Sequence, residues 1–418
     1  MNADTYKDLR RNKRMNSGQK SGVTVRAAKK RAGWALPPLS TIPKVSQIDD
    51  KMKKTILSAL AEFGIDAKVA RLKQGPVVTR FELLPAAGAD ASRICELSAN
   101  LTLALKTESI RIQAPMPGKR LVGVEVPNCI TAPVVLRQVL ESSAWKRSKD
   151  ALPLALGQDV GGQVLIADLA SLPHMLIAGA TGQGKTVGMK SILAGLLMTR
   201  TPDELRLILI DLNADAFAGY NDLPHLWMPV IADPRKAISS LQWAIEEMER
   251  RFKMFRQAKV RNIRAYNGRS SQAPRHESET ITVPLPDRLP YVVIIIKELA
   301  DLMLNSQKEI EPRIKKLTSL AHTAGIHMVI ATQRPTADVL TSAIKSNIPG
   351  RVALKVSQKK DSLAIIDQDG ADTLLGKGDM LVLMCANNLM RAQGALTKDM
   401  EIQAVVDHWK RQVKAQQR

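Results

Sequence analysis

The spacing of apolar residues changes along the chain, and these changes predict its secondary structure. In the first third, segments with apolar residues three and four positions apart, typical of helices, are followed by segments of period two, typical of strands. The order helix, strand, strand, helix, strand, strand predicts a small α+β domain. Its expected elements cover residues 51–63, 67–72, 77–83, 91–105, 110–112 and 122–126.

From residue 150 to about residue 400, short runs that are apolar throughout replace the alternating pattern. A strand has this composition when helices cover both faces of its sheet. Helical patterns such as 191–198 and 234–259 follow the runs. Strands that alternate with helices predict a parallel, doubly wound sheet, whose ligands bind at the carboxyl ends of the strands. The runs lie at residues 164–167, 175–178, 205–211, 291–296 and 329–331.

These patterns and the distribution of charge divide the chain into four parts. Residues 1–36 are rich in Lys and Arg and poor in apolar residues, which predicts a disordered basic tail. The tail could contact DNA phosphates or an acidic partner, or only keep the chain soluble. Residues 37–148 form the small α+β domain and residues 149–404 the larger α/β domain. Residues 405–418 are expected to be a basic C-terminal helix or tail.

The composition favours a polyanionic partner. The 418 residues carry a formal net charge of +21 and have a pI near 10.0, which is extreme for a soluble enzyme. Clustered Lys and Arg side chains gain free energy from counterion release on nucleic acid. A basic surface that only confers solubility is the alternative. Because aromatic residues make up 3% of the chain, it offers few platforms for stacking single-stranded bases, and duplex DNA is favoured.

The cysteines and the hydropathy predict a cytoplasmic protein. Cys95, Cys129 and Cys385 lie far apart, without the spacing of metal ligands, and three cysteines cannot all pair as disulfides. We expect them to be reduced core residues. No apolar run approaches the roughly 20 residues that span a bilayer, and no apolar segment follows the charges at the N-terminus. We therefore expect no contact with a membrane.

A glycine-rich segment follows the apolar run 175–178. Gly179 to Thr186 fit the pattern G-x4-G-K-[ST], in which backbone N–H groups point at phosphate oxygens where a helix begins. Lys185 would neutralise the β- and γ-phosphates of ATP, and Thr186 would hold Mg²⁺ through its hydroxyl. An incidental glycine-rich turn is the alternative. The residues expected to bind the nucleotide are Gly179, Ala180, Thr181, Gly182, Gln183, Gly184, Lys185, Thr186 and Val187.

Several segments together resemble the FtsK/SpoIIIE family of hexameric double-stranded DNA translocases. They occur in the family's order and extend over about residues 36–400. The segments are Pro76–Leu83, Pro173–Thr186, Met248–Phe252, Ala324–Pro335, Asn347–Arg351 and Leu374–Met380.

The resemblance implies a RecA-like P-loop ATPase domain with a parallel doubly wound sheet, preceded by the family's smaller alpha domain. It also implies a homo-oligomer, a hexameric ring around duplex DNA that uses ATP and Mg²⁺. We find in the sequence neither the family's N-terminal membrane helices nor its C-terminal winged-helix domain. The expectation is therefore a soluble form of the motor.

The resemblance also assigns catalytic roles. Glu298 corresponds to the general base that polarises the attacking water, and Gln333 to the sensor of the γ-phosphate. Without the resemblance, Glu298 would be interpreted as a solvated side chain at a strand end, and Gln333 as a capping or turn residue. Lys185 completes the expected catalytic set with Arg351, which, like Arg334, could supply positive charge across a subunit boundary.

Four positions depart from the family's pattern. Lys297 replaces the Walker B aspartate, which orders Mg²⁺ through water, and His322 replaces an arginine that is a candidate finger acting in trans. Asp211-Leu-Asn replaces the family's Asp-Pro-Lys, and Leu363 replaces an arginine. A cation at position 297 would repel the metal if it pointed inward. Asp211, at a neighbouring strand end, is a possible replacement for the lost carboxylate.

Three lysines lie in segments that resemble the pore loops of the family. They are Lys345, Lys359 and Lys360. Loops facing the channel of a ring would hold DNA phosphates without reading bases, as a motor indifferent to sequence requires. Each lysine alone could equally be a solvated surface charge.

The sequence therefore predicts a cytoplasmic, ring-forming, ATP-driven translocase of double-stranded DNA, suited to moving or packaging the DNA of a phage or another mobile element. A rival from another class is a DNA-binding ring that binds ATP without hydrolysing it, which Lys297 and His322 favour. A small-molecule kinase with the same loop is a weaker rival, because no acceptor-site motif is visible.

Overall fold

A computed structural model describes residues 52–86, 91–116, 118–128, 131–269, 285–384 and 389–417. The expected basic tail, Cys129 and Cys385 lie outside these residues. None of the helices in the described ranges is long and apolar enough to cross a membrane.

The small domain is a four-stranded antiparallel sheet in the order β1-β2-β4-β3, packed against helices. Phe81 and Val124 of the sheet pack with Ile56 and Leu101 of the helices in one buried cluster. The helix expected over residues 91–105 is two helices that meet at Leu97. The elements are α2 (Met52–Glu62), β1 (Ala67–Gln74), β2 (Val78–Pro85), α3 (Ala91–Glu96), α4 (Ser98–Leu105), β3 (Arg111–Gln113) and β4 (Val122–Pro127).

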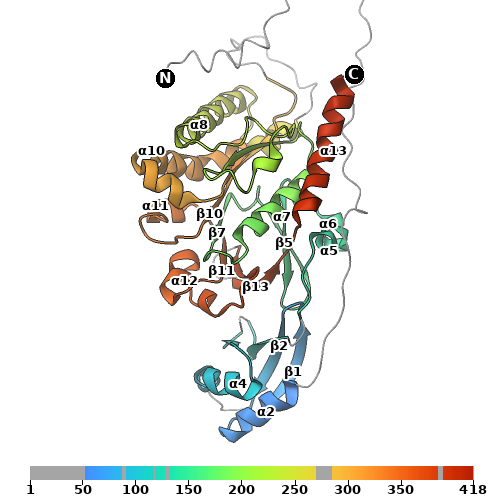
Figure 1. Ribbon diagram of the computed structural model, residues 1–418, viewed down its shortest axis with the longest axis vertical. Helices are drawn as coiled ribbons and strands as arrows, with labels where there is room; N and C mark the ends of the chain where they lie inside the picture. The colour runs from blue at the N-terminus through green and yellow to red at the C-terminus, as the bar shows by residue number, and fades with distance from the viewer. Residues whose placement is uncertain are drawn as a thin grey trace, which may run out of the picture. The chain divides into compact units, whose positions relative to one another are not determined.

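The larger domain is built on one sheet, in which the described residues supply nine strands in the order β6-β5-β13-β12-β11-β7-β10-β9-β8 (Figure 1). The strands from β11 to β8 are parallel, which confirms the predicted parallel sheet for this half. The other half, from β11 to β6, is antiparallel and was not predicted. The strands are β5 (Pro153–Asp159), β6 (Val164–Asp168), β7 (His174–Ala178), β8 (Leu205–Ile210), β9 (Tyr291–Ile296), β10 (Ile326–Thr332), β11 (Gly350–Leu354), β12 (Asp379–Leu383) and β13 (Leu389–Gly394).

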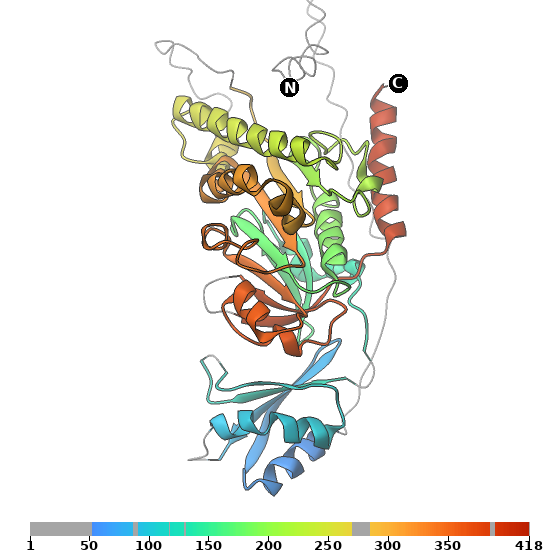
Figure 2. The ribbon, with the colours of Figure 1, turned by 60° about the vertical axis from the view of Figure 1, so that its left-hand side comes forward.

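Helices cover both faces of the parallel half, as its apolar strands require. In β9, Val292 to Ile296 are all 0% exposed, so both faces of this strand are buried. Helices α8 and α10 lie on one face, and α7 and α13 on the other (Figures 1 and 2). The helices are α5 (Leu136–Glu141), α6 (Ser143–Arg147), α7 (Lys185–Leu197), η2 (Ala218–Tyr220), α8 (Pro234–Gln257), α9 (Ile263–Gly268), α10 (Leu299–Leu320), η3 (Ala321–Ala324), α11 (Ser342–Lys345), α12 (Lys359–Ile366), η4 (Ala371–Thr373) and α13 (Asp399–Gln417).

Helix α13 runs through the boundary expected between residues 404 and 405. Its Val406 and Trp409 are 0% exposed, and the indole N–H of Trp409 donates to the carbonyl oxygen of Leu197 at 3.1 Å. The helix therefore packs on α7 as part of the larger domain, because a buried indole and its hydrogen bond fix its position.

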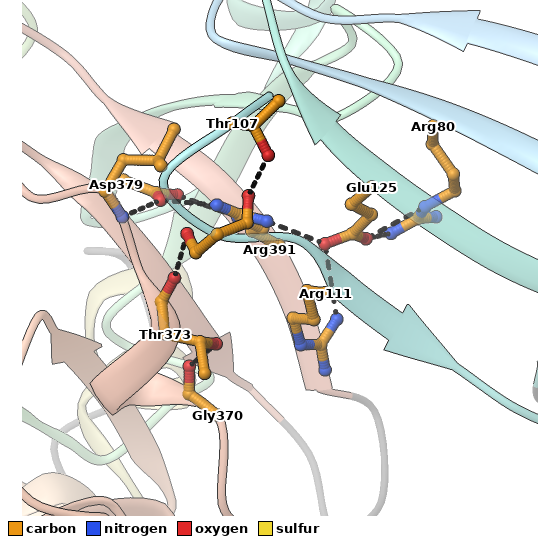
Figure 3. A network of polar contacts seen from close by, with 10 residues as sticks. Arg80, Thr107, Arg111, Glu125, Gly370, Thr373, Asp379 and Arg391 are labelled. Atoms are coloured by element: carbon orange, nitrogen blue, oxygen red, sulfur yellow. Dashed lines mark hydrogen bonds and ion pairs between the residues drawn. The ribbon is translucent and has the colours of Figure 1, made fainter. Parts of the chain in front are cut away.

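Buried charges connect the small domain to the larger one (Figure 3). Glu125 of β4, 0% exposed, accepts from Arg80 and Arg111 of the small domain and from Arg391 of β13 at 3.1 Å. Arg391 also donates two hydrogen bonds to Asp379 of β12, at 3.0 and 2.7 Å. Burial alone would raise the pKa of Glu125, but the three arginines outweigh it and lower the pKa. Glu125 is therefore ionised and paired from both domains.

Replacing Arg391 by Gln should destabilise the chain strongly. The change leaves Asp379, 2% exposed, without its bidentate partner, and breaking a buried pair on one side costs about 3–5 kcal/mol. Urea unfolding followed by circular dichroism measures the loss. Lys316→Gln is the control, because the Lys316–Glu249 pair is about half exposed and is expected to contribute less than about 1 kcal/mol. Equal midpoints for the two variants would contradict this account.

Buried histidines make the fold sensitive to acid. Burial lowers the pKa of His327 on β10 to about 4, although its Nδ1 lies 2.8 Å from the carbonyl oxygen of Pro173. Burial also lowers the pKa of His225 to about 4, against the opposing effect of a hydrogen bond to Arg200. His174 and His322 have lowered pKa values for the same first reason. These side chains are neutral in the folded chain at neutral pH.

Folding stability should fall as the pH drops from about 6.5 towards 4, because the unfolded chain then binds protons that the folded chain excludes. A histidine whose pKa moves from about 6.5 to about 4 costs about 2 kcal/mol between pH 7.5 and pH 5. Urea unfolding at both pH values of the wild type and of His225→Gln checks this. The variant should lose less stability on acidification, and an identical loss would contradict the assignment to His225.

Candidate active site

The glycine-rich loop joins β7 to α7, as the sequence predicts. Gly182 and Gly184 have φ angles of 77° and 109°, which a side chain would strain, and a Cβ on Gly184 would approach the backbone N of Gly378 to 3.1 Å. Within the described part of the chain, the N–H groups of Gly182, Gly184, Lys185 and Thr186 have no acceptor. They are the free donors of a helix N-terminus, suited to an anion.

Lys185 lies folded over the loop. Its Nζ donates to the carbonyl oxygens of Gly179 and Ala180 at 2.7 and 2.9 Å. Burial lowers the pKa of Lys185, and the nearby carboxylate of Glu298 partly opposes this effect. The ammonium therefore sits at the loop with only carbonyl partners, which a phosphate group can replace.

Loops that follow β11 and precede β12 hold the glycine-rich loop from the side. The N–H of Ala180 donates to Lys355 at 2.9 Å, and the N–H of Gly378 donates to Gln183 at 3.0 Å. The segment Leu374–Met380 had no predicted role beyond its resemblance to the family. Its Gly-Lys-Gly spacing was the signal for a backbone that approaches the nucleotide loop closely.

A cavity of about 570 Å³ opens beside the loop, and its lining is mostly apolar. It extends from α7 to the segment before α5 and to the loop before β12. The volume and the apolar lining suit the base of a nucleotide. Its lining includes Thr131, Val134, Gly184, Val187, Lys377 and Leu396.

Glu298 lies at the carboxyl end of β9 and faces β10. Its carboxylate accepts from the Thr332 hydroxyl at 2.6 Å and from the N–H of Gln333 at 2.9 Å. Burial raises the pKa of Glu298, and these hydrogen bonds, with Lys185, oppose the rise. The side chain of Gln333 accepts from the hydroxyl of Thr181 at 2.8 Å. The structure therefore brings Glu298, Gln333, Thr181 and Lys185 together, and Thr332 is an anchor that the sequence analysis missed.

Lys297 points to the other neighbouring strand. Its ammonium lies 3.1 Å from the carboxylate of Asp211, which follows β8, and also contacts Asp215. Asp211, 1% exposed, accepts in addition from the N–H groups of Ala216 and Phe217 at 2.8 and 3.3 Å. The metal role offered to Asp211 remains a prediction, and these contacts argue against it because they already engage both carboxylate oxygens.

The two candidates for a charge acting in trans, Arg351 and Arg334, and His322, which replaces the family's arginine, lie in different surroundings. Arg351 is 11% exposed and donates to Asp367 and to the carbonyl oxygens of Ile348 and Lys345. His322 lies beside His174, the first residue of β7, and thus at the opposite end of that strand from the glycine-rich loop. Arg334 is exposed and directly follows Gln333. Arg334 is therefore the candidate whose side chain is not committed to a buried network.

The three lysines expected to bind DNA also differ. Lys345, 17% exposed, pairs with Asp367 at 2.6 Å, and Lys359 pairs with the exposed Asp369 at 2.7 Å. Lys360, at the start of α12, is exposed and has no ion-pair partner within the described ranges. The geometry favours Lys360, then Lys359, as surface cations, and Lys345 as part of a structural pair.

The residues of the glycine-rich loop are compatible with Mg²⁺ bound through one protein ligand, the hydroxyl of Thr186. The Thr186 hydroxyl is half-buried at the helix start and makes no hydrogen bond to another described residue. Across the described ranges, no three His, Cys, Asp or Glu side chains gather as metal ligands. This matches the way that Mg²⁺ is held at nucleotides, mainly by phosphates and water.

Comparison with known proteins agrees with this geometry. The model of the FtsK alpha domain matches residues 38–128, and that of the FtsK/SpoIIIE family matches residues 135–337. The chain belongs to the FtsK/SpoIIIE family. It is 44% identical over 390 residues to the DNA translocase FtsK of Caldanaerobacter subterraneus, which covers 91% of this chain and 53% of the relative. It is 44% identical to the DNA translocase SpoIIIE of Bacillus subtilis, covering 88% of this chain and 46% of the relative.

This member of the FtsK/SpoIIIE family thus spans about half the length of the curated relatives it matches. Among solved structures, it is similar to the pCW3 conjugation coupling protein TcpA with ATPgS, at a TM-score of 0.58 and 20% identity over 86% of this chain and 99% of that chain. The cytoplasmic domain of the type VII secretion ATPase EccC of Thermomonospora curvata gives a TM-score of 0.55 at 20% identity, over 67% and 34% of the two chains. At this identity the two structures support the fold alone.

Replacing Lys185 by Ala should abolish ATP binding and leave the fold intact, because the change removes one phosphate contact from a half-buried loop. Binding of a fluorescent ATP analogue measures the loss, and circular dichroism checks the fold. Lys190→Ala is the control, since Lys190 lies on the same helix but pairs with Asp399. Unchanged affinity in Lys185→Ala would refute the assignment of the loop.

Proposed function

We propose that the chain is an ATP-driven translocase of double-stranded DNA that acts as a hexameric ring in the cytoplasm. The reaction is the Mg²⁺-dependent hydrolysis of ATP by water, coupled to movement along the DNA backbone. The observation that carries this proposal is the contact chain from Glu298 through Gln333 to Thr181 of the glycine-rich loop. It joins a half-buried carboxylate to a phosphate-binding loop, as hydrolysis requires.

Each part of the site has a chemical task in this proposal. The free N–H groups of the loop and the Lys185 ammonium hold the phosphates, and the apolar cavity takes the base. Thr186 would hold Mg²⁺, which neutralises charge that develops on the phosphates. Glu298 accepts hydrogen bonds from the attacking water, and its raised pKa makes it a stronger base than an exposed carboxylate.

Two observations support DNA as the partner: the charge of the chain, and its relatives, which are named DNA translocases. The net charge of +21 suits a polyanion, and Lys359 and Lys360 present ammonium groups where α12 begins. A motor that moves along any sequence needs contacts to phosphates rather than bases. Movement or packaging of mobile-element DNA suits such contacts, and so does the movement of chromosomes.

A second candidate is a ring that binds ATP and DNA without turnover. The feature that favours it is Lys297, which stands where the family has the aspartate that orders Mg²⁺ through water. Steady-state ATP hydrolysis with and without duplex DNA separates the two candidates. We expect turnover that duplex DNA stimulates, because Lys185, Thr186, Glu298 and Gln333 are all present. Tight ATP binding without turnover at any DNA concentration would favour the static ring.

DNA affinity should fall steeply with salt and depend little on sequence, since each phosphate contact contributes about 0.9 to the slope of log affinity against log salt. Replacing Lys359 and Lys360 together by Ala should reduce that slope by about 2 on two unrelated duplexes. Lys345→Ala is the matched variant: it should lower the melting temperature and leave the salt slope unchanged, because Lys345 is engaged with Asp367. A reduced slope only in Lys345→Ala would reverse this assignment.

A further inference from the structure

Asp211 and Lys297 are neighbours by strand register. β8 and β9 are parallel, and their last paired residues are Ile210 and Ile296. The N–H of Lys297 donates to the carbonyl oxygen of Ile210 at 3.0 Å, so the ladder continues one residue further. The next residues along both strands, Asp211 and Lys297, therefore stand side by side at the carboxyl edge of the sheet.

The Lys297–Asp211 pair is largely shielded from solvent. Asp211 is 1% exposed and Lys297 13% exposed, so neither charge is screened by water as a surface pair is. The second carboxylate, that of Asp215, also contacts the ammonium and is mainly exposed. The ammonium is the counter-ion of the buried Asp211 carboxylate, whereas water also solvates the exposed carboxylate of Asp215.

Asp211 also shapes the loop that follows β8. Its second oxygen accepts from the N–H groups of Ala216 and Phe217, which closes residues 211–217 into a turn. The ring of Phe217 is 0% exposed and packs edge-on against Tyr220 at 5.9 Å between centroids. The charge at Asp211 therefore connects the end of β9 to a loop that is anchored in the core.

Lys297 and Glu298, the two residues that follow β9, contact different neighbouring strands. Lys297 reaches β8 and its loop, whereas Glu298 accepts from Thr332 and Gln333 at the end of β10. β9 lies between β8 and β10 in the sheet, so Lys297 and Glu298 make their contacts on opposite sides of β9. Lys297 is thus directed away from the strand that carries the glycine-rich loop.

We propose that Lys297 is a positioning residue: its ammonium is the permanent counter-ion of Asp211 and Asp215 and fastens loop 211–217 to the end of β9. The carboxyl edge of the sheet is then held by an internal charge pair. It follows that Lys297 and Asp211 form one unit, which can be exchanged only together. This inference goes beyond the proposed function, since it holds whether or not the chain hydrolyses ATP.

The test is a charge exchange across the pair. Lys297→Asp and Asp211→Lys each place like charges side by side at a buried position, and each should lower the melting temperature by about 5–15 °C. The double variant Asp211→Lys with Lys297→Asp restores one charge of each sign and should recover part of that loss. Recovery is incomplete because a lysine at position 211 cannot accept from the N–H groups of Ala216 and Phe217. Lys297→Arg, which keeps the charge, should remain close to the wild type. Lys316→Asp is the surface control and should shift the melting temperature by no more than about 2–4 °C.

Variants with uncharged side chains at both positions test the proposal if the charged single variants do not fold. Lys297→Gln leaves Asp211 buried without its counter-ion, and adding Asp211→Asn removes that charge. The melting temperature should therefore rise from the single to the double variant. Single variants as stable as the wild type, or no recovery in either double variant, would overturn the proposal.

A second readout distinguishes a counter-ion from a side chain that only fills space. Lys297→Asp gathers three carboxylates at positions 211, 215 and 297, so MgCl₂ without nucleotide should raise the melting temperature of this variant. The wild type should show no such rise, because the ammonium already occupies the position between Asp211 and Asp215. An equal response to MgCl₂ in both proteins would contradict the proposed role. Neither readout depends on ATP turnover, so a failure of the proposed function would leave the result interpretable.

Discussion

The parallel register of β8, β9, β10 and β7 is the constraint on which the site depends. Parallel strands end on the same side of a sheet, so residues far apart in the sequence meet at one edge without long loops. Asp211, Lys297 and Glu298 meet in this way, and Thr332 joins them from β10. The strands are apolar on both faces because helices cover each side of this half of the sheet.

In the larger domain, ion pairing and burial distinguish the cationic side chains that are structural from those that are free to bind a partner. Lys297, Lys345 and Arg351 have most of their side chains buried and are engaged with aspartates, whereas Lys360 and Arg334 are exposed. A buried cation without a partner would cost several kcal/mol, so the burial of these residues requires their carboxylates. The same rule explains Glu125 between two domains: its three arginines lower its pKa and keep the buried carboxylate ionised.

The sequence predicted the elements whose pattern is local and strong. It located β9 and the glycine-rich loop, and the family comparison confirms the expected membership. It did not predict β11, β12 and β13. β11 pairs with β7 and β13 with β5, and both partners are distant in the chain. Residue type alone also could not show that Lys297 turns to Asp211, or that Lys345 pairs with Asp367. Both depend on strand register and burial, which a lysine in a sequence does not report.

We propose that Glu298 activates the water that attacks bound ATP, and removing its carboxylate is the most direct test. Glu298→Gln keeps the shape and the size of the side chain but removes the base. ATP binding and steady-state hydrolysis with duplex DNA should be measured for this variant and for the wild type. The variant should bind ATP with similar affinity, and its turnover should fall about 10²- to 10⁴-fold. Equal turnover in both proteins, or none in the wild type, would contradict it.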